Sequence, residues 1–174
     1  MKFRMTFREA PRRVLLLVNP KSGSGNAEWA RFKDVLAARG CELVERVLDD
    51  PERNPEHVSG AREFGAVVVA GGDGTVSSVA YELRDQGVPI LAFPAGTANL
   101  IAQNLNLPTS AEALADVLER GVTVQTDLAE ISAGSFTWGF ALIAGLGADA
   151  AMIRDSEDLK PHLGAGAYVV GALR

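Results

Sequence analysis

The 174-residue sequence contains a single cysteine, Cys41, and only two histidines. One cysteine excludes an intrachain disulfide and a cysteine-based zinc site, which fits a reducing cytosol. The sequence also lacks an apolar run long enough to span a bilayer. The run Val14–Val18 is too short for the apolar core of a signal peptide, and Asn19 and Pro20 close it.

Positive charge is concentrated at the N-terminus and scarce elsewhere. Residues 1–13 hold five basic residues and one acidic residue, a charge of +4, whereas the whole chain carries −5, so residues 14–174 carry −9. An acidic body argues against general nucleic-acid binding. The basic segment is interpreted as a frayed, soluble N-terminus, with contact to an anionic lipid surface as the alternative.

Apolar residues make up 47% of the chain, which is enough for a hydrophobic core. Trp29, Phe32, Val35 and Leu36 share one helical face and are expected in that core. The pattern predicts strands over 14–18, 41–48, 66–70 and 88–93, and helices over 27–39, 56–63, 75–86, 98–105 and 110–120. This alternation predicts an α/β fold with an open, mostly parallel sheet and helices on both faces.

The pattern changes after Gly121. Residues 122–132 and 136–147 are expected to form an antiparallel hairpin around a Gly-Ser turn, followed by a helix-like stretch over 159–173. We therefore expect a basic tail over 1–13, an α/β domain over 14–124 and the start of a β-rich second domain over 125–174. The second segment is expected to be incomplete, and its exposed apolar surface favours self-association into homo-oligomers.

Three glycine-containing loops follow predicted strands and precede predicted helices. Their sequences are NPKSGSG (19–25), GGDGT (71–75) and PAGTAN (94–99). Open α/β sheets bind ligands beyond the carboxyl ends of their strands, where all three loops are expected. Glycine lets backbone N–H groups approach an anion, hydroxyl groups donate further hydrogen bonds, and a helix N-terminus attracts negative charge. The loops therefore predict a phosphate site.

Asp73 lies at the centre of the second loop, where a carboxylate repels phosphate unless a cation lies between them. Because Mg²⁺ binds through few carboxylates, several waters and phosphate oxygens, we interpret Asp73 as serving a metal–nucleotide. The structural alternative is that Asp73 caps the helix that begins near Thr75. Gly72 is expected to need a positive φ, which valine tolerates badly. Lys21 either pairs with a phosphate or is solvated.

In this order and spacing the three loops resemble those of the diacylglycerol kinase catalytic domain family, which includes bacterial lipid kinases and sphingosine kinases. The resemblance runs from about Val14 to the chain end, where GLGADAAMI (145–153) and LKPHLGAGAYVVGALR (159–174) look like the family's crossing into its second domain. The GGDGT loop alone is less specific, since phosphofructokinases and NAD kinases carry similar loops.

The resemblance implies a cytoplasmic, ATP-dependent lipid kinase that transfers the γ-phosphate of ATP to a lipid hydroxyl, with peripheral contact at the inner membrane face as a further expectation. The first domain would hold the nucleotide and the second the lipid. Asp73 would face Mg²⁺ or the reacting hydroxyl, as the candidate catalytic and metal-binding residue. The positions that the resemblance places at ATP are Asn19, Pro20, Lys21, Ser22, Gly23, Gly71, Gly72, Asp73, Gly74, Thr75, Val76, Ser77, Ser78, Gly96, Thr97 and Asn99.

Some positions depart from the family pattern. Ser77 and Ser78 stand where many members have Asn-Glu, and Leu100 stands where many have Asp. Members also continue past a point like Arg174, into a region that usually carries a catalytic acidic residue and a structural metal site. Two alternatives therefore stay open: a nucleotide- or lipid-binding module without activity, and an NAD kinase-like phosphotransferase. Diacylglycerol, a sphingoid base and phosphatidylglycerol are all open as substrates.

The remaining motifs are weaker. GLGADA (145–150) fits a dinucleotide-binding pattern but lacks an acidic residue about twenty positions further on, so tight packing is the better interpretation. His57 and His162 are expected at the surface. Asp127 lies at the expected domain crossing and is a candidate for the cleft there. Asp149 follows a glycine turn and is a site candidate whose alternative role is to cap the next helix.

Phe136, Trp138 and Phe140 alternate along one predicted strand and therefore share one face. We interpret this face as second-domain core, with a lipid-facing wall as the alternative.

Overall fold

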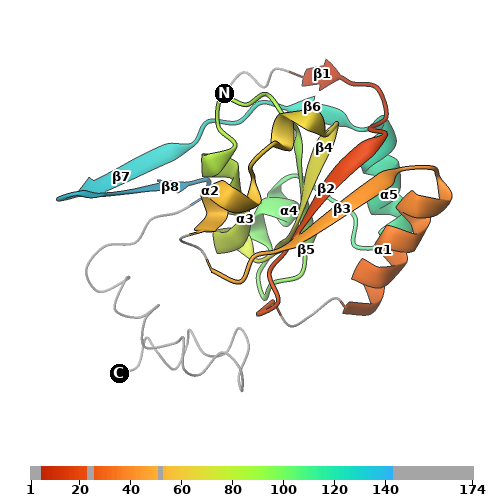
Figure 1. The fold of residues 1–174 in the computed structure, drawn as a ribbon, viewed down its shortest axis with the longest axis horizontal. Helices are drawn as coiled ribbons and strands as arrows, with labels where there is room; N and C mark the ends of the chain where they lie inside the picture. Colours follow the sequence, from red (N-terminus) through yellow and green to blue (C-terminus); the bar gives the residue numbers. More distant parts are fainter. Residues whose placement is uncertain (1–4, 23–25, 51–52, 143–174) are drawn as a thin grey trace. The chain divides into compact units, whose positions relative to one another are not determined.

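The computed structural model describes residues 5–22, 26–50 and 53–142, which belong to one compact unit. Strands and helices alternate in this unit (Figure 1). The alternating elements are β2 (Arg13–Val18), α1 (Asn26–Ala38), β3 (Glu42–Val47), α2 (Asn54–His57), β4 (Ala66–Gly71), α3 (Asp73–Glu82), β5 (Ile90–Pro94), α4 (Leu100–Asn104) and α5 (Ala111–Arg120).

Four of these strands form one sheet in the order β3-β2-β4-β5, and every neighbouring pair is parallel. The central strands β2 and β4 carry continuous apolar runs over residues 14–18 and 66–70, as expected for strands that are buried on both faces. The chain leaves β2 toward β3 on one side and returns to β4 on the other. The order of the strands therefore reverses between β2 and β4, and such a switch point is where open α/β sheets bind ligands.

Helices cover both faces of the sheet. Val14 and Leu16 of β2 pack in a core cluster with α1 and α5, whereas Leu15 and Leu17 pack in a second cluster with α3 and the segment 58–64. All four side chains are fully buried. The predicted parallel sheet with helices on both faces is confirmed.

An aromatic group fills the core beneath α1. The ring centroids of Trp29 and Phe32 lie 5.8 Å apart, and those of Trp29 and Phe93 lie 4.9 Å apart. Leu36 is buried in the same cluster and Val35 packs against it. The predicted core face of this helix is confirmed.

Several helices differ from the prediction at their ends. The helix expected over 56–63 is interrupted, because α2 ends at His57 and a 3₁₀-helix, η2 (Ala61–Glu63), follows Gly60, whose φ is +72°. A left-handed residue cannot continue an α-helix. For the same reason α4 begins at Leu100 and not at Ala98, since Asn99 has a φ of +52°.

Part of the basic N-terminus is ordered as a strand. β1 (Met5–Phe7) pairs antiparallel with β6 (Val122–Val124), so the expectation of a frayed tail is wrong for these residues. The hairpin is also shorter than expected. It consists of β7 (Ala129–Ala133) and β8 (Phe136–Phe140) around Gly134, which has a φ of +62°.

The aromatic face of the hairpin is exposed. The rings of Phe136 and Trp138 stack with centroids 5.5 Å apart, and these residues are 63% and 56% exposed. Phe140 is half-buried. The interpretation of this face as core is therefore wrong for Phe136 and Trp138 within the described residues.

The predicted helix over 159–173, the GLGADA segment, Asp149 and His162 lie outside the described residues. No helix in the described part of the chain has the length and hydropathy needed to cross a membrane. The boundary expected between 124 and 125 stays a prediction.

Candidate functional site

The three glycine loops leave neighbouring strands at one edge of the sheet. Val18 is in register with Ala70, and Gly71 is in register with Pro94, so β2, β4 and β5 end side by side. This is the carboxyl edge of the sheet, and the first two loops flank its switch point (Figure 1). The predicted placement of the loops at one sheet edge is confirmed.

Asn19 joins the first loop to the second. Its backbone N–H donates to the Ala70 carbonyl (2.9 Å), which extends the pairing of β2 and β4 by one residue. Its side-chain Nδ2 donates to Thr75 Oγ1 (2.8 Å), and its Oδ1 accepts from the Lys21 N–H (2.9 Å). Asn19 therefore fixes both the shape of its own loop and its distance from α3.

The other predicted residues of the first loop are less constrained. Pro20 and Lys21 are exposed, and Ser22 is half-buried with its N–H donating to the Asn19 carbonyl (3.1 Å). Gly23 lies outside the described residues.

The second loop brings backbone N–H groups to the start of α3. Gly72 occupies the N-cap position, and no side chain caps this end of the helix. The first N–H groups of a helix have no partner within it, so this N-terminus is suited to an anion. Gly72 has a φ of −84°, so the expectation of a positive φ is wrong. Glycine is required instead at Gly71, where a Cβ would lie 2.7 Å from Thr75 Cβ.

The third loop closes on itself and touches the second. Asn99 Oδ1 accepts from the Gly96 N–H, and Asn99 Nδ2 donates to the Gly96 carbonyl, both at 2.8 Å. A Cβ on Gly96 would overlap Gly72 Cα and lie 3.1 Å from Gly72 N. Two backbones thus meet directly at this point. Thr97 is exposed at the tip of the loop.

Asp73 links the second loop to α4. One carboxylate oxygen, Oδ1, accepts from the Ile101 N–H in the first turn of α4 (2.8 Å). A structural role for Asp73 was expected, but in capping its own helix and not α4. The described residues contain no cluster of three or more His, Cys, Asp or Glu side chains that suits a metal. A magnesium ion bound mainly by phosphate oxygens needs no such cluster, and the second Asp73 oxygen lies outside the Ile101 contact.

The predicted positions that follow Thr75 turn toward the protein. Val76 is 6% exposed and its N–H donates to the Gly72 carbonyl (3.0 Å). Ser78 Oγ accepts from Nδ2 of the buried Asn54 (2.7 Å), and Ser77 Oγ accepts from the Ala141 N–H (3.4 Å). The two serines that replace Asn-Glu therefore join α3 to α2 and to the residue after β8.

The hairpin rests on the far half of α3. The Tyr81 hydroxyl donates to Glu130 of β7, and a Cβ on Gly139 would overlap the Tyr81 ring. The hydrogen bond to Glu130 raises the pKa of the Tyr81 phenol. One helix thus carries the aspartate loop at its start and the hairpin further along.

The expectation that His57 lies at the surface is wrong. Its side chain is only 11% exposed, and Nε2 lies 3.2 Å from Asp49 Oδ1. Asp127 is exposed between β6 and β7. No periodic pattern predicts that Asn54 is buried or that the His57 side chain is largely covered.

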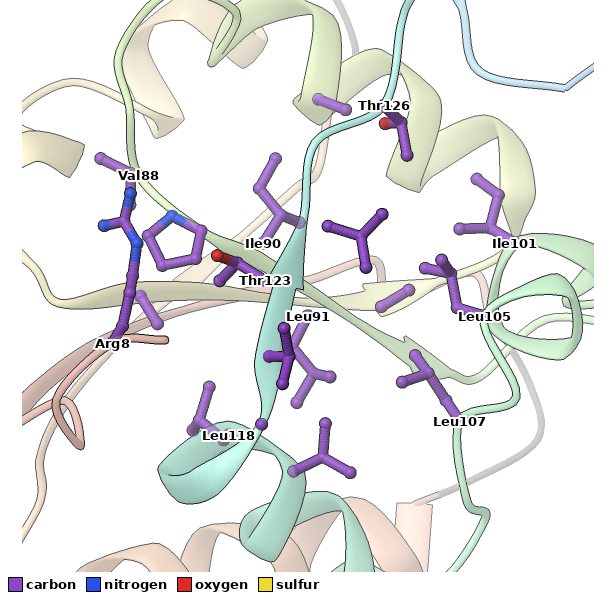
Figure 2. A pocket seen from close by; sticks show the side chains of 18 of the residues that line it. Arg8, Val88, Ile90, Leu91, Ile101, Leu105, Leu107, Leu118, Thr123 and Thr126 are labelled. Atoms are coloured by element: carbon purple, nitrogen blue, oxygen red, sulfur yellow. The ribbon is translucent and has the colours of Figure 1, made fainter. Parts of the chain in front are cut away.

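A separate apolar cavity of about 500 Å³ lies along the outer edge of β5 (Figure 2). The side chains of Leu91, Ile101, Leu107 and Leu118 line it, and Arg8 lies at one end. The described residues of the three glycine loops do not line it. Its apolar walls are unsuited to a phosphate, which leaves the loops as the candidate phosphate site.

Comparison with known families agrees with this geometry. Residues 13–131 match the family described as "Diacylglycerol kinase catalytic domain". The match begins at β2 and ends within β7, so it includes all three loops.

Curated proteins that resemble this chain include named lipid kinases. A "Diacylglycerol kinase" of Mycobacterium tuberculosis is 36% identical over 144 residues, which cover 79% of this chain and 46% of the relative. A Xanthomonas oryzae protein named "Probable lipid kinase YegS-like" is 37% identical over 172 residues, which cover 92% of this chain and 55% of the relative. The chain spans about half the length of these curated relatives.

A crystal structure described as a diacylglycerol kinase from Bacillus anthracis superimposes with a TM-score of 0.55. The two chains are 25% identical, and the match covers 64% of this chain and 41% of the other.

Proposed function

The chain belongs to the diacylglycerol kinase catalytic domain family, and from this premise we propose that it binds ATP at the three glycine loops and transfers the γ-phosphate to the hydroxyl of a lipid. Because such a lipid resides in a membrane, we place the reaction in the cytoplasm, at the inner membrane face.

One observation carries the proposal: the first and second loops are joined across the switch point by the Asn19–Thr75 hydrogen bond of 2.8 Å. The first backbone N–H groups of α3 follow the second loop, and this helix N-terminus has no side-chain cap. Thr97 adds an exposed hydroxyl from the third loop. Converging N–H and hydroxyl donors bind the phosphate groups of a nucleotide and align them for transfer.

Asp73 fits a role beside a magnesium ion. Its Oδ1 is held by Ile101, which fixes the carboxylate, and its Oδ2 is the oxygen that we assign to the metal or to the reacting hydroxyl. Magnesium, when bound, would neutralise charge on the phosphate oxygens. The chain itself would contribute a fixed carboxylate and the donors of the loops.

The proposed transfer is a simple displacement at phosphorus. The lipid hydroxyl oxygen forms a bond to the γ-phosphorus, and the bond from that phosphorus to its bridging oxygen breaks. ADP leaves with that electron pair, and the hydroxyl proton is released. Such a reaction requires alignment and charge neutralisation more than covalent participation by the protein.

Transfer from ATP labelled in the γ-phosphate tests the proposal. The acceptors are diacylglycerol, a sphingoid base and phosphatidylglycerol in mixed micelles, with NAD as the competing acceptor. Label in a lipid and not in NAD is expected. Label in NAD alone would contradict the lipid kinase assignment and support an NAD kinase-like enzyme.

The contact between Asp73 and Ile101 favours a second candidate, a nucleotide-binding module without activity. In it Asp73 would serve only to hold α4. This module would bind ATP with ordinary affinity but transfer no label, even as part of a longer chain that continues past Arg174.

A further inference from the structure

Within the proposed ATP site, we propose that Asn19 is a positioning residue that orients the Thr75 hydroxyl as a donor to a phosphate group. The inference rests on the proposed nucleotide site and assigns Asn19 a role different from the direct contact expected above.

Each polar group of Asn19 has a protein partner. The backbone N–H donates to Ala70, and the carbonyl accepts from Ser22 (3.1 Å). Oδ1 accepts from the Lys21 N–H, and Nδ2 donates to Thr75 Oγ1. These bonds hold the Asn19 side chain in one orientation, with its NH₂ group against Thr75.

The hydrogen bond between Asn19 and Thr75 has a defined direction. The Lys21 N–H can only donate, so the amide oxygen of Asn19 must face Lys21 and its NH₂ group must face Thr75. Thr75 Oγ1 is therefore the acceptor, and its own hydrogen is directed elsewhere. A phosphate oxygen is a strong acceptor for such a hydroxyl, because hydrogen bonds to ionised groups are stronger than neutral ones.

The backbone beneath Thr75 also restricts the position of its side chain. A Cβ on Gly71 would lie 2.8 Å from Thr75 Cγ2, so the threonine methyl rests directly on the loop. The methyl contact and the Asn19 bond together hold the Thr75 side chain from two sides. The Thr75 hydroxyl is thus preorganised before a ligand arrives, which lowers the entropic cost of binding.

A double-mutant cycle on ATP affinity tests the inference, with Asn19→Ala, Thr75→Val and the double variant measured by calorimetry. Thr75→Val keeps the branched side chain over Gly71 and removes only the hydroxyl, so affinity should fall about tenfold or more. Asn19→Ala should weaken binding by about fivefold to tenfold. If Asn19 acts through Thr75, the double variant should bind about as weakly as Thr75→Val alone.

Independent contacts with ATP would instead multiply, and a double variant weaker by the product of the two losses would overturn the inference. Asn19→Ala combined with Thr97→Val is the matched control pair. These side chains share no hydrogen bond among the described residues, so their effects should multiply.

Two further readouts separate orientation from simple loss of structure. Thr75→Ser keeps the hydroxyl and should bind ATP within about threefold of wild type. Tripolyphosphate should lose affinity in parallel with ATP in Asn19→Ala and Thr75→Val, whereas adenosine should not. Equal losses for adenosine would mean that the site has collapsed and would overturn the positioning role.

Asn19→Asp is a second test variant, to be used if thermal melting shows that Asn19→Ala is unfolded. Its carboxylate keeps an acceptor for Lys21 but accepts the Thr75 hydroxyl hydrogen, so ATP and tripolyphosphate should both bind at least fivefold more weakly. Unchanged affinity in Asn19→Asp would contradict the inference. Absence of ATP binding by the wild-type chain would overturn the proposed nucleotide site itself, and this inference with it.

Discussion

At the scale of single residues, Asp73 uses one carboxylate oxygen for a structural contact, and we propose that the other serves the metal or the reacting hydroxyl. Oδ1 holds the first turn of α4 through the Ile101 N–H, and Oδ2 lies outside that bond. The two possible roles of Asp73, helix cap and metal-binding residue, therefore use different oxygens and can be separated by mutation.

Asp73→Asn should leave the fold intact, because the amide oxygen can still accept from Ile101. It should abolish the gain in ATP affinity that Mg²⁺ provides, since the neutral amide is a weaker metal ligand than a carboxylate. Calorimetric titration with and without Mg²⁺ measures this gain, and Asp73→Ala serves as a comparison that loses both roles. If Asp73→Asn binds Mg·ATP as tightly as wild type, the metal role is wrong.

Gly74 of the second loop and Gly96 of the third differ in the space that surrounds them. A Cβ on Gly74 would meet no protein atom within 4 Å, whereas one on Gly96 would overlap Gly72. Gly74→Ala should therefore leave stability unchanged or raise it by up to about 1 kcal/mol, because alanine is the better helix former. The same change should weaken ATP binding, since its methyl group would occupy space that a phosphate needs.

Gly96→Ala is the matched comparison and should lower both stability and ATP affinity. Urea unfolding and ATP titration of the two variants give the answer. Full ATP affinity in a folded Gly74→Ala variant would mean that phosphate does not approach α3 closely.

At the scale of elements, α3 connects the phosphate loops to the hairpin. The aspartate loop precedes its first turn, and the Tyr81 side chain packs against Gly139 of β8 and donates to Glu130 of β7. A substitution at the base of the hairpin should therefore change the packing of the hairpin on α3.

Gly139→Ala should detach the hairpin from α3, because its methyl group would overlap the Tyr81 ring. Overpacking of this kind costs about 1–3 kcal/mol. Hydrogen exchange should show lost protection over residues 129–140, and Tyr81→Leu in the same chain should restore part of it by making room. Ser135→Ala, in the exposed turn, is the control and should change nothing. Unaltered protection in Gly139→Ala would show that the hairpin does not depend on this contact.

The contact between Tyr81 and Glu130 should also depend on pH. The hydrogen bond to Glu130 raises the pKa of the Tyr81 phenol in the folded protein. The stabilisation is therefore complete below the ordinary tyrosine pKa of about 10 and is lost as pH rises through the higher folded value. Ultraviolet titration should show one tyrosine ionising late, and Tyr81→Phe should remove that late step. A wild-type titration identical to free tyrosine would contradict the contact.

The strands and the loops were predictable because their signals are local. Residues 14–18 of β2 and 66–70 of β4 are uninterrupted apolar runs, and the glycine loops follow these runs directly. The break at Gly60 was missed because the helical pattern continues across it, while its φ of +72° follows from the local turn. The pairing of β1 with β6 joins segments more than a hundred residues apart, and no local pattern reports such a pairing.

The candidate site was predictable in its location but not in its internal contacts. The sequence indicated that Asn19, Asp73 and Asn99 belong to it, and the strand order brings their loops to one edge. Each of these side chains is nevertheless engaged by the protein, with Thr75, Ile101 and Gly96 respectively. Such contacts depend on how three loops meet in space, which residue types and spacing do not encode.

At the scale of the whole molecule, the described part of the chain is an α/β unit whose carboxyl edge gathers three phosphate-binding candidates. The curated relatives are about twice as long as this chain. We expect nucleotide binding to reside in the described unit, because its loops are joined to one another by hydrogen bonds and backbone contact.

Calorimetric titration of the chain with ATP, with and without Mg²⁺ and with NAD as the comparison ligand, tests the nucleotide site most directly. Saturable ATP binding that Mg²⁺ strengthens, without comparable binding of NAD, is the predicted result. Failure of ATP to bind at all would contradict the assignment of the three loops as a nucleotide site.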